Sequence, residues 1–435
     1  MKKSKLSNII LCIAIIAALC VAPFAPSAEA APFLPFSSPT QTTAAQTSTQ
    51  VRHIILNVGA PEIIIDGVTS RLSAPPVVIS GTTLVPLRAI FEALSTEVHW
   101  SSGNITARNE NTEIKLTVGS TTAYRNGTPI TLSVAPQLID GRTMVPLRFI
   151  AESLGAEVQW IQSTRTIRIA MVPDGAQYVR LGDARIFMGD PLDHVRAILG
   201  RSDSVEQSAH DFDWHVYSSD YSRFLLVGIK DRRVVALYTN STGFETVGAK
   251  YGDAGASMSY RMEGNAVRFL DDAIPAPGIK LFVSEGKVYA VRILPEVLVD
   301  KTSFSNEFYR SQERLLFHIT NAYRASQGLS VLMYDDAAAI AGRNHCKDMV
   351  VRNYFSHITP EGVNLVQRYN TAGGVGVRIG EALGRVETHS MLGIDTFNGI
   401  MNSVGHKQLM DRPEHDHLGT GVHETHMALV FAGHY

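Results

Sequence analysis

The chain has 435 residues, with 39 Lys and Arg against 41 Asp and Glu and a formal net charge of −2. This length can supply several hydrophobic cores, and the charge balance excludes the basic surface that binds nucleic acids or anionic membranes. Ten of the fifteen histidines lie at or beyond His318. This skew indicates a C-terminal site that uses imidazole, for metal binding or for proton transfer.

The first 30 residues have the pattern of an export signal. Three lysines precede an apolar run at residues 9–21, and residues 28–30 read as a small-residue cleavage site. The run is too short to favour a permanent membrane span, and a lipid anchor at Cys20 is disfavoured by the bulky residue before it. We therefore expect a secreted protein, extracellular or associated with the cell wall, with no integral membrane segment after cleavage.

Cleavage would leave Cys346 as the only cysteine, so the mature chain could form no internal disulfide. Cys346 falls in a predicted helix, where we expect a buried small apolar residue and not a nucleophile. The net charge of the mature chain becomes about −4, because three lysines and one glutamate are lost. Residues 31–51 are rich in Ser, Thr, Pro and Gln and are interpreted as a flexible linker.

A tandem repeat organises residues 52–171. The segment at residues 81–94 recurs at 141–154, 60 residues later, which predicts two supersecondary units that share a core. Each unit is expected to contain a hairpin at Asp66-Gly67 or Asn126-Gly127, a strand, a short helix and a closing strand. Two further predictions concern the helices: a proline begins each one, and surface ion pairs form at i, i+4. The residues concerned are Pro86, Pro146, Arg88 with Glu92, and Arg148 with Glu152.

The shared Val-Pro-Leu-Arg and Val-x-Trp patterns of this repeat resemble those of the copper amine oxidase N-terminal-like domain of secreted proteins. We nevertheless predict no copper site, because His99 is replaced by Gln159 in the second copy and no ligand cluster surrounds either position. The resemblance implies a stalk or wall-associating module, by analogy alone.

Residues 172–300 are predicted to form a mixed domain, with an antiparallel sheet and a helix over residues 192–199 that Gly200 ends. Gly189-Asp-Pro191 and the Trp-x-Val-Tyr stretch resemble the domain that often precedes bacterial CAP modules. His210 and His215 are interpreted as ordinary surface or sheet residues.

Residues 301–435 begin with two predicted helices. The first has apolar residues at helical spacing from Leu315 to Tyr323 and ends at Gly328. The second runs to about Arg352, with a cap at Asp335 or at the aspartate after it. Three loop-like motifs follow, each with one histidine or acid: Tyr-Phe-Ser-His357, Gly-Glu381 and Ser-x-Gly-His406.

The order of these motifs resembles that of the CAP superfamily of cysteine-rich secretory, antigen 5 and pathogenesis-related proteins, in its bacterial SCP-like branch. The resemblance implies an α-β-α sandwich whose groove contains His357, Glu381 and His406. Two imidazoles and a carboxylate suit a divalent cation such as Zn²⁺. Without a metal, the acid would raise an imidazole pKa and fix its tautomer. The overall class predicted is thus α+β multidomain: tandem β-rich repeats, a mixed middle domain and this sandwich.

The sequence departs from the family pattern at two places. Ala382 replaces an asparagine after the groove acid, and the fourth groove residue is unassigned between Thr425 and His426. The remaining histidines are read as structural: His345 as a core residue, the cluster at 413–417 with His423 and His426 as an exposed polar loop, and His318, His389 and His434 as surface.

Three functions stay open at this point. We favour a non-enzymatic, envelope-associated module whose groove binds a divalent metal or small ligand. The alternatives are a metal-dependent secreted hydrolase, and a wall-binding structural protein that attaches to a cell-wall polymer. The chain contains no Gly-x-Ser-x-Gly or His-Glu-x-x-His motif to support a hydrolase, so its catalytic residues are unknown.

Overall fold

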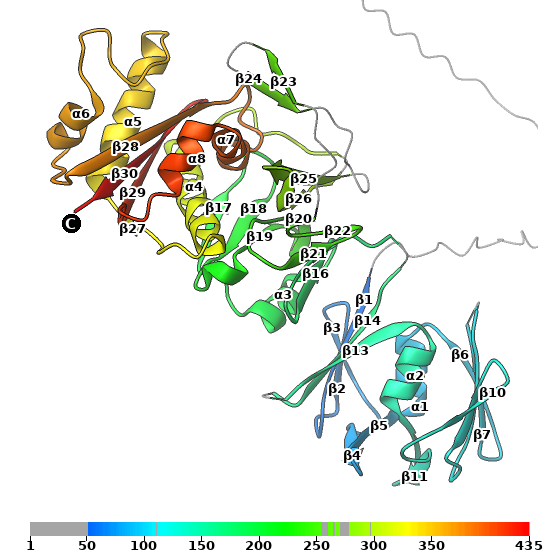
Figure 1. The fold of residues 1–435 in the computed structure, drawn as a ribbon. Coiled ribbons are helices and arrows are strands. Elements are labelled where there is room, and N and C mark those ends of the chain that lie inside the picture. Colours follow the sequence, from blue (N-terminus) through cyan, green and yellow to red (C-terminus); the bar gives the residue numbers. More distant parts are fainter. Residues whose placement is uncertain are drawn as a thin grey trace, which may run out of the picture. The chain divides into compact units, whose positions relative to one another are not determined.

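The structure is a computed structural model that describes residues 51–434, apart from 110, 163, 174, 254–259, 264, 265, 270–277 and 296. The predicted export signal and nearly all of the predicted linker lie outside the described residues. The described chain is α+β, as predicted (Figure 1).

Both copies of the repeat contain the predicted hairpin, strand, helix and closing strand. Asp66-Gly67 and Asn126-Gly127 all have positive φ, as two-residue hairpin turns require. The first copy comprises β1 (Arg52–Asn57), β2 (Glu62–Ile65), β3 (Val68–Arg71), β4 (Val77–Ile79), β5 (Thr82–Pro86), α1 (Leu87–Ala93), β6 (Glu97–Ser101) and β7 (Asn104–Arg108). The second comprises β8 (Glu113–Thr117), β9 (Thr122–Arg125), β10 (Thr128–Thr131), β11 (Gln137–Ile139), β12 (Arg142–Pro146), α2 (Leu147–Ser153), β13 (Ala156–Ile161) and β14 (Thr166–Met171).

The two copies exchange strands. Two five-stranded sheets have the orders β13-β14-β1-β2-β3 and β10-β9-β8-β7-β6, and each joins three strands of one copy to two of the other. A four-stranded sheet, in the order β11-β12-β5-β4, takes two strands from each copy. Ile90 of α1 and Ile150 of α2 lie in the same buried cluster. Neither copy therefore completes a sheet or a core alone.

Two details of the repeat helices differ from prediction. Pro86 and Pro146 are the N-cap residues that end the preceding strands, one position before the helices begin. Arg148 and Glu152 form the expected ion pair at 3.0 Å, but Arg88 and Glu92 form none, although both are described.

The middle region contains the predicted antiparallel sheet, in the order β17-β18-β19-β20-β26-β25. Helix α3 (Leu192–Leu199) ends at Gly200, whose φ of 83° few other residues adopt. The strands are β15 (Tyr178–Leu181), β16 (Ala184–Phe187), β17 (Ser204–Gln207), β18 (Asp213–Tyr217), β19 (Leu225–Lys230), β20 (Arg233–Thr239), β21 (Phe244–Thr246), β22 (Ala249–Lys250), β23 (Tyr260–Glu263), β24 (Ala266–Phe269), β25 (Ile279–Ser284) and β26 (Lys287–Ile293), with a 3₁₀ turn at Tyr221–Arg223.

The C-terminal region has a four-stranded sheet in the order β27-β29-β30-β28, with β28 at one edge. Alternate residues of β30 pack on different helices: Ala428 and Val430 lie in a cluster with α5, and Leu429 and Phe431 in a cluster with α4 and α7. The elements are α4 (Asn306–Ser326), β27 (Met333–Tyr334), α5 (Asp336–Val351), α6 (Leu365–Thr371), β28 (Arg378–Arg385), α7 (Leu392–Met401), α8 (Val404–Met410), β29 (His417–His423) and β30 (His426–Gly433).

A single hydrophobic core crosses from the middle region into the C-terminal region. Trp214 and Phe282 belong to the same buried cluster as Leu316 and Phe397. Polar bonds cross as well, such as that from the Tyr289 hydroxyl to the Asn398 side-chain oxygen at 2.7 Å. The middle sheet therefore supports α4 and α7 directly.

One buried carboxylate joins three elements of the C-terminal region. Glu313 of α4 accepts from Arg310 at 2.6 Å, from Arg343 of α5 at 2.7 and 2.9 Å, and from the Val422 backbone N–H of β29 at 2.9 Å. Its side chain is 2% exposed. The Glu313 backbone carbonyl also accepts from Thr420 at 2.9 Å. Removing the charge would leave both guanidinium groups without a counterion.

Burial raises the pKa of Glu313 to about 7, so the test belongs at pH 8, where the carboxylate is ionised. There we predict that Glu313→Gln lowers the free energy of unfolding by about 3 kcal/mol, at the low end for breaking a buried ion pair because both arginines keep some contact with water. Urea unfolding followed by circular dichroism measures this loss. Glu307→Gln is the control, because the carboxylate of Glu307 is 59% exposed in its pair with Arg314. This control should cost less than about 1 kcal/mol. Equal losses in both variants would contradict the assigned role.

Candidate functional site

The structure brings together the three residues predicted from the motifs and adds a fourth. His357 donates from Nδ1 to Glu381 at 2.9 Å, and the other oxygen of Glu381 accepts from Arg368 at 2.7 Å. The rings of His357 and His406 are arranged edge-to-face, with their centroids 6.4 Å apart. The candidate site is therefore a row from Arg368 through Glu381 and His357 to His406.

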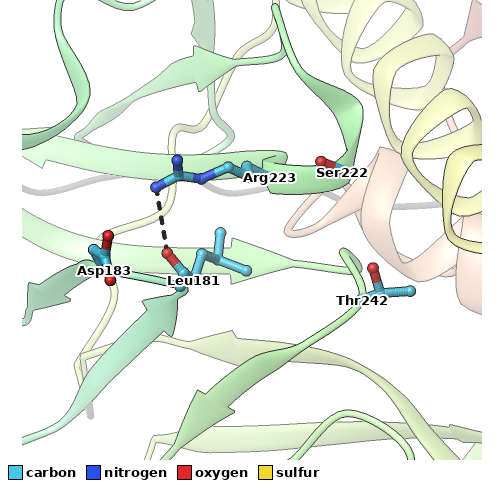
Figure 2. Close-up of a pocket in the computed structure, with 6 residues that line it drawn as sticks. Leu181, Asp183, Ser222, Arg223 and Thr242 are labelled. Carbon is cyan, nitrogen blue, oxygen red and sulfur yellow. Dashed lines mark hydrogen bonds between the residues drawn. The ribbon is translucent and has the colours of Figure 1, made fainter.

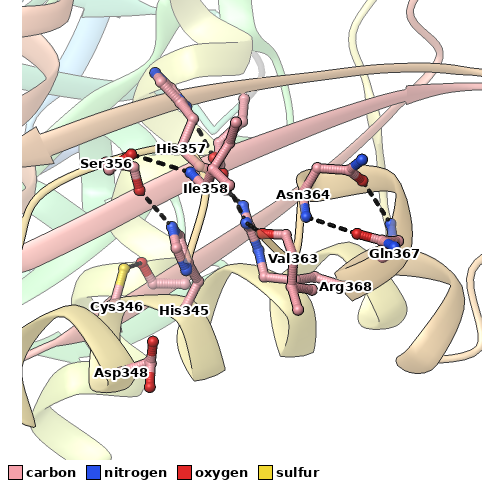
Figure 3. Close-up of polar contacts among 12 residues, drawn as sticks. His345, Cys346, Asp348, Ser356, His357, Ile358, Val363, Asn364, Gln367 and Arg368 are labelled. Carbon is pink, nitrogen blue, oxygen red and sulfur yellow. Dashed lines mark hydrogen bonds and ion pairs between the residues drawn. The ribbon is translucent and has the colours of Figure 1, made fainter. Parts of the chain in front are cut away.

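The loop that carries His357 is held from below by α5 and from the side by α6 (Figure 3). His345 of α5 donates from Nε2 to the Ser356 carbonyl at 2.7 Å. Arg368 of α6 donates to the His357 carbonyl at 2.8 Å. Asn364 and Gln367 form a reciprocal capping box that begins α6 and so fixes where Arg368 lies.

Glycine at position 380 lets α8 pack against the edge strand. A Cβ on Gly380 would lie 2.3 Å from a terminal methyl carbon of Leu409 on α8, so that side chain would have to shift. Gly380 thus leaves room beside Glu381 for the helix that carries His406.

Burial and neighbouring charges set the pKa of Glu381, the acid at the centre of the row. The Glu381 side chain is 2% exposed and that of Arg368 is 9% exposed, whereas that of His357 is 53% exposed. Burial by itself would raise the pKa of Glu381, but the bonds from His357 and Arg368 outweigh it and hold this pKa below the usual value. Burial, and then the neighbouring His357, lower the pKa of His406. At neutral pH the site thus contains an ionised acid beside a neutral imidazole at position 406.

Sequence reasoning missed Arg368, because an arginine on a short helix has no distinctive local signal. Only the fold shows that α6 packs beside β28. Two predictions about neighbouring residues hold. Cys346 is fully buried, and burial raises its pKa well above normal, which makes it a poor nucleophile. His345 is a core residue, 1% exposed.

The fourth groove residue is not His426. This histidine pairs with Arg385 on β28, whereas Glu381 pairs with Val430. Four residues along a strand separate them by about 13 Å. Thr425 lies in the turn before β30, further still from Glu381.

Several other histidines lie at internal contacts. His318 was expected at the surface, but it is only partly exposed and bonds the Tyr221 hydroxyl of the middle region at 2.8 Å. His389 stacks on Phe304 with centroids 4.4 Å apart. His210 is fully buried and contacts Asp300 at 2.7 Å. These roles depend on contacts between distant segments, which is why the sequence did not reveal them.

Within the described residues, two groups have at least three ligand atoms within 4.8 Å of one another: His53, Asp190 and His194, and then Asp416, His417 and His434. The histidine-rich segment is not the exposed loop that was predicted, because His415 and His426 are buried and His423 and His426 lie on β29 and β30. Asp416 and His417 of the second group belong to this segment, and His434, predicted at the surface, is partly exposed just after β30. The groove residues are more widely spaced.

A separate pocket of about 210 Å³ lies in the middle region (Figure 2). Arg223 donates to the Leu181 carbonyl at 3.4 Å on its wall, and Asp183, Ser222 and Thr242 also line it. It contains none of the predicted site residues.

Comparisons with known proteins agree with the motif order. Residues 40–101 and 64–169 match the copper amine oxidase N-terminal domain, residues 188–267 the CAP-associated N-terminal domain, and residues 317–432 the cysteine-rich secretory protein family. No helix in the described ranges combines the length and apolar character needed to cross a membrane.

Two relatives come from Bacillus subtilis (strain 168). Uncharacterized membrane protein YlbC is 25% identical over 277 residues, which cover 54% of this chain and 79% of the relative. Uncharacterized protein YkwD is 27% identical over 113 residues, which cover 26% of this chain and 43% of the relative.

Among solved structures, an extracellular protein with an SCP domain from Bacillus anthracis str. Ames is similar at 22% identity and a TM-score of 0.49, covering 57% of this chain and 93% of that one. From the domain match at residues 317–432, and from the groove motifs within it, this part of the chain forms a CAP domain similar to those of the cysteine-rich secretory protein family.

Proposed function

We propose that this protein is an extracellular CAP-domain module whose groove binds a divalent cation of the zinc class through His357 and His406. The observation that carries the proposal is the bond from Nδ1 of His357 to Glu381. In a neutral imidazole that donates from Nδ1, Nε2 keeps its lone pair, which is the form that ligates metal.

The donor set fits such an ion. With Zn–N bonds of about 2.0 Å and a tetrahedral angle, two imidazoles on one ion have ring centres about 5 Å apart. The His357 and His406 centroids are 6.4 Å apart, so the rings would approach by about 1 Å when the ion binds. The low pKa of His406 favours its neutral, ligating form at neutral pH.

Glu381 takes a positioning role in this proposal, in place of the ligand role expected from the motif alone. One of its oxygens accepts from His357 and the other from Arg368. A carboxylate that orients a ligating histidine in this way is a common outer-shell partner of zinc. Such an ion would supply Lewis acidity and hold a water at an open position.

The same geometry disfavours the hydrolase alternative. A general base works best with a pKa near the working pH, whereas the ion pair with Arg368 holds the pKa of Glu381 below its usual value. The extracellular location rests on the export pattern of residues 1–30 and on the match of residues 317–432 to the cysteine-rich secretory protein family. Attachment to a cell-wall polymer through the repeats remains a secondary candidate.

We predict that Zn²⁺ binds the full chain and raises its melting temperature, because the ion binds only the folded groove. Titration calorimetry on chelator-treated protein should show that the double variant His357→Ala with His406→Ala binds one zinc ion per chain fewer than wild type. Glu381→Gln should still bind this zinc ion, but with an affinity about 10- to 100-fold lower, as expected for an outer-shell partner.

His389→Ala is the matched control, because this histidine lies in the same domain and stacks on Phe304 outside the row. It should leave the number of bound ions unchanged. An unchanged zinc stoichiometry in the His357 and His406 double variant would refute the groove proposal.

A second prediction concerns acid stability. The pKa of Glu381 is lower in the folded chain than the ordinary value of 4.5, so its stabilising contribution is complete above about pH 4.5 and is lost as the pH falls below it. Glu381→Gln should cost about 3 to 5 kcal/mol at pH 7, because it leaves the buried Arg368 unpaired.

This cost should shrink steadily from pH 4.5 to pH 3, as measured by urea unfolding at each pH. The control is Glu387→Gln, an exposed glutamate just after β28, for which no trend with pH is expected. A cost that is constant over this range would show that Glu381 is not stabilised as a carboxylate.

A further inference from the structure

Three buried ionisable residues meet where the repeat contacts the middle region. His53 lies on β1, Asp190 in the turn before α3, and His194 in the first turn of that helix. Nε2 of His53 is 2.5 Å from one oxygen of Asp190, and Nε2 of His194 is 3.9 Å from the other. The two rings lie with centroids 3.9 Å apart.

This trio is the most deeply buried group of potential ligands in the described chain. The side chains of His53, Asp190 and His194 are 3%, 0% and 7% exposed. Nδ1 of each ring is buried without a hydrogen-bond partner. Two imidazoles and one carboxylate that converge in a buried place form a donor set that a divalent cation accepts. The unpartnered Nδ1 atoms add a burial cost that an ion held by the Nε2 atoms would not remove.

We propose that His53, Asp190 and His194 form a divalent-metal site of the zinc class that joins the first strand of the repeat to the Gly-Asp-Pro turn. The ligands would be the two Nε2 atoms and one Asp190 oxygen. Four-coordinate zinc with bonds of about 2.0 Å places its ligand atoms about 3.3 Å apart. The two Nε2 atoms lie 2.5 and 3.9 Å from different oxygens of Asp190, and the ring centroids are 3.9 Å apart. Binding would therefore move the rings apart by about 1 Å, because two imidazoles on a tetrahedral ion have centres about 5 Å apart.

The second shell of this site is partly in place. The Asp190 oxygen nearer to His194 also accepts from the Phe187 backbone N–H at 2.9 Å, which fixes the carboxylate plane. The backbone N–H of His53 donates to Asp66 at 2.8 Å, which ties β1 to the turn between β2 and β3. Burial lowers the pKa of His194 well below its usual value, so this ring is neutral and able to ligate at pH 7.

Two cations work against metal binding here. Arg168 of β14 is nearly buried and donates to the Ala197 carbonyl of α3. Arg233 donates to the Gly189 carbonyl at 2.9 Å, one residue before Asp190. Both guanidinium groups are directed at backbone carbonyls and not at the Asp190 carboxylate, which leaves its oxygens to the imidazoles. The expected affinity is lower than that of a site with two or more carboxylates.

The test is a zinc titration of the full chain after chelator treatment, comparing wild type with His194→Gln. This variant keeps the bond between His53 and Asp190, so the fold should survive, as circular dichroism can verify. We expect His194→Gln to bind one equivalent less than wild type and to lose part of the zinc-induced rise in melting temperature. His215→Gln, a half-buried histidine of the same region that contacts Ser202, should match wild type.

Zinc-edge anomalous diffraction from wild-type crystals gives a second measurement that needs no variant. A peak within bonding distance of both Nε2 atoms and Asp190 would support the proposal. Full stoichiometry in His194→Gln, or zinc-loaded crystals with no peak there, would overturn it. This test is independent of the test of the groove. The double variant at His357 and His406 should lose the zinc ion of the groove and keep the one at His53, Asp190 and His194.

Discussion

The buried carboxylate of Glu313 is the constraint on which the CAP domain depends. Three elements converge on it: its own helix α4, helix α5 through Arg343, and strand β29 through the backbone of Val422. A buried charge is tolerated only when its partners are in place. Helix α5 is therefore held on one face of the sheet, and the loop that follows it begins from a defined point.

The geometry of the groove follows from that arrangement. Helix α5 carries His345, which holds the loop at Ser356, and the next residue is His357. Strand β28 pairs with β30 along its length and so presents Glu381 at the sheet edge. The site is precise because rigid elements support it, although its exposed residue lies on a loop.

The two proposed metal sites illustrate different uses of the same chemistry. In the groove, a half-exposed His357 is oriented by a buried acid, which suits an ion that remains accessible to solvent or to a ligand. At the junction, His53 and His194 are buried with Asp190 between two parts of the chain. An ion there would serve stability, because it would link residues that are distant in the sequence.

The sequence by itself determined the local elements and the groove motifs. Periodicity and turn chemistry placed the hairpins at Asp66-Gly67 and Asn126-Gly127 and the end of α3 at Gly200, because those signals act over a few residues. Motif order located His357, Glu381 and His406. The tertiary structure alone decided the strand exchange between repeats, the ion pair of Arg368 and the meeting of His53 with Asp190. Each of these joins residues that are distant in sequence, and such pairings follow from packing and burial, which no local pattern encodes.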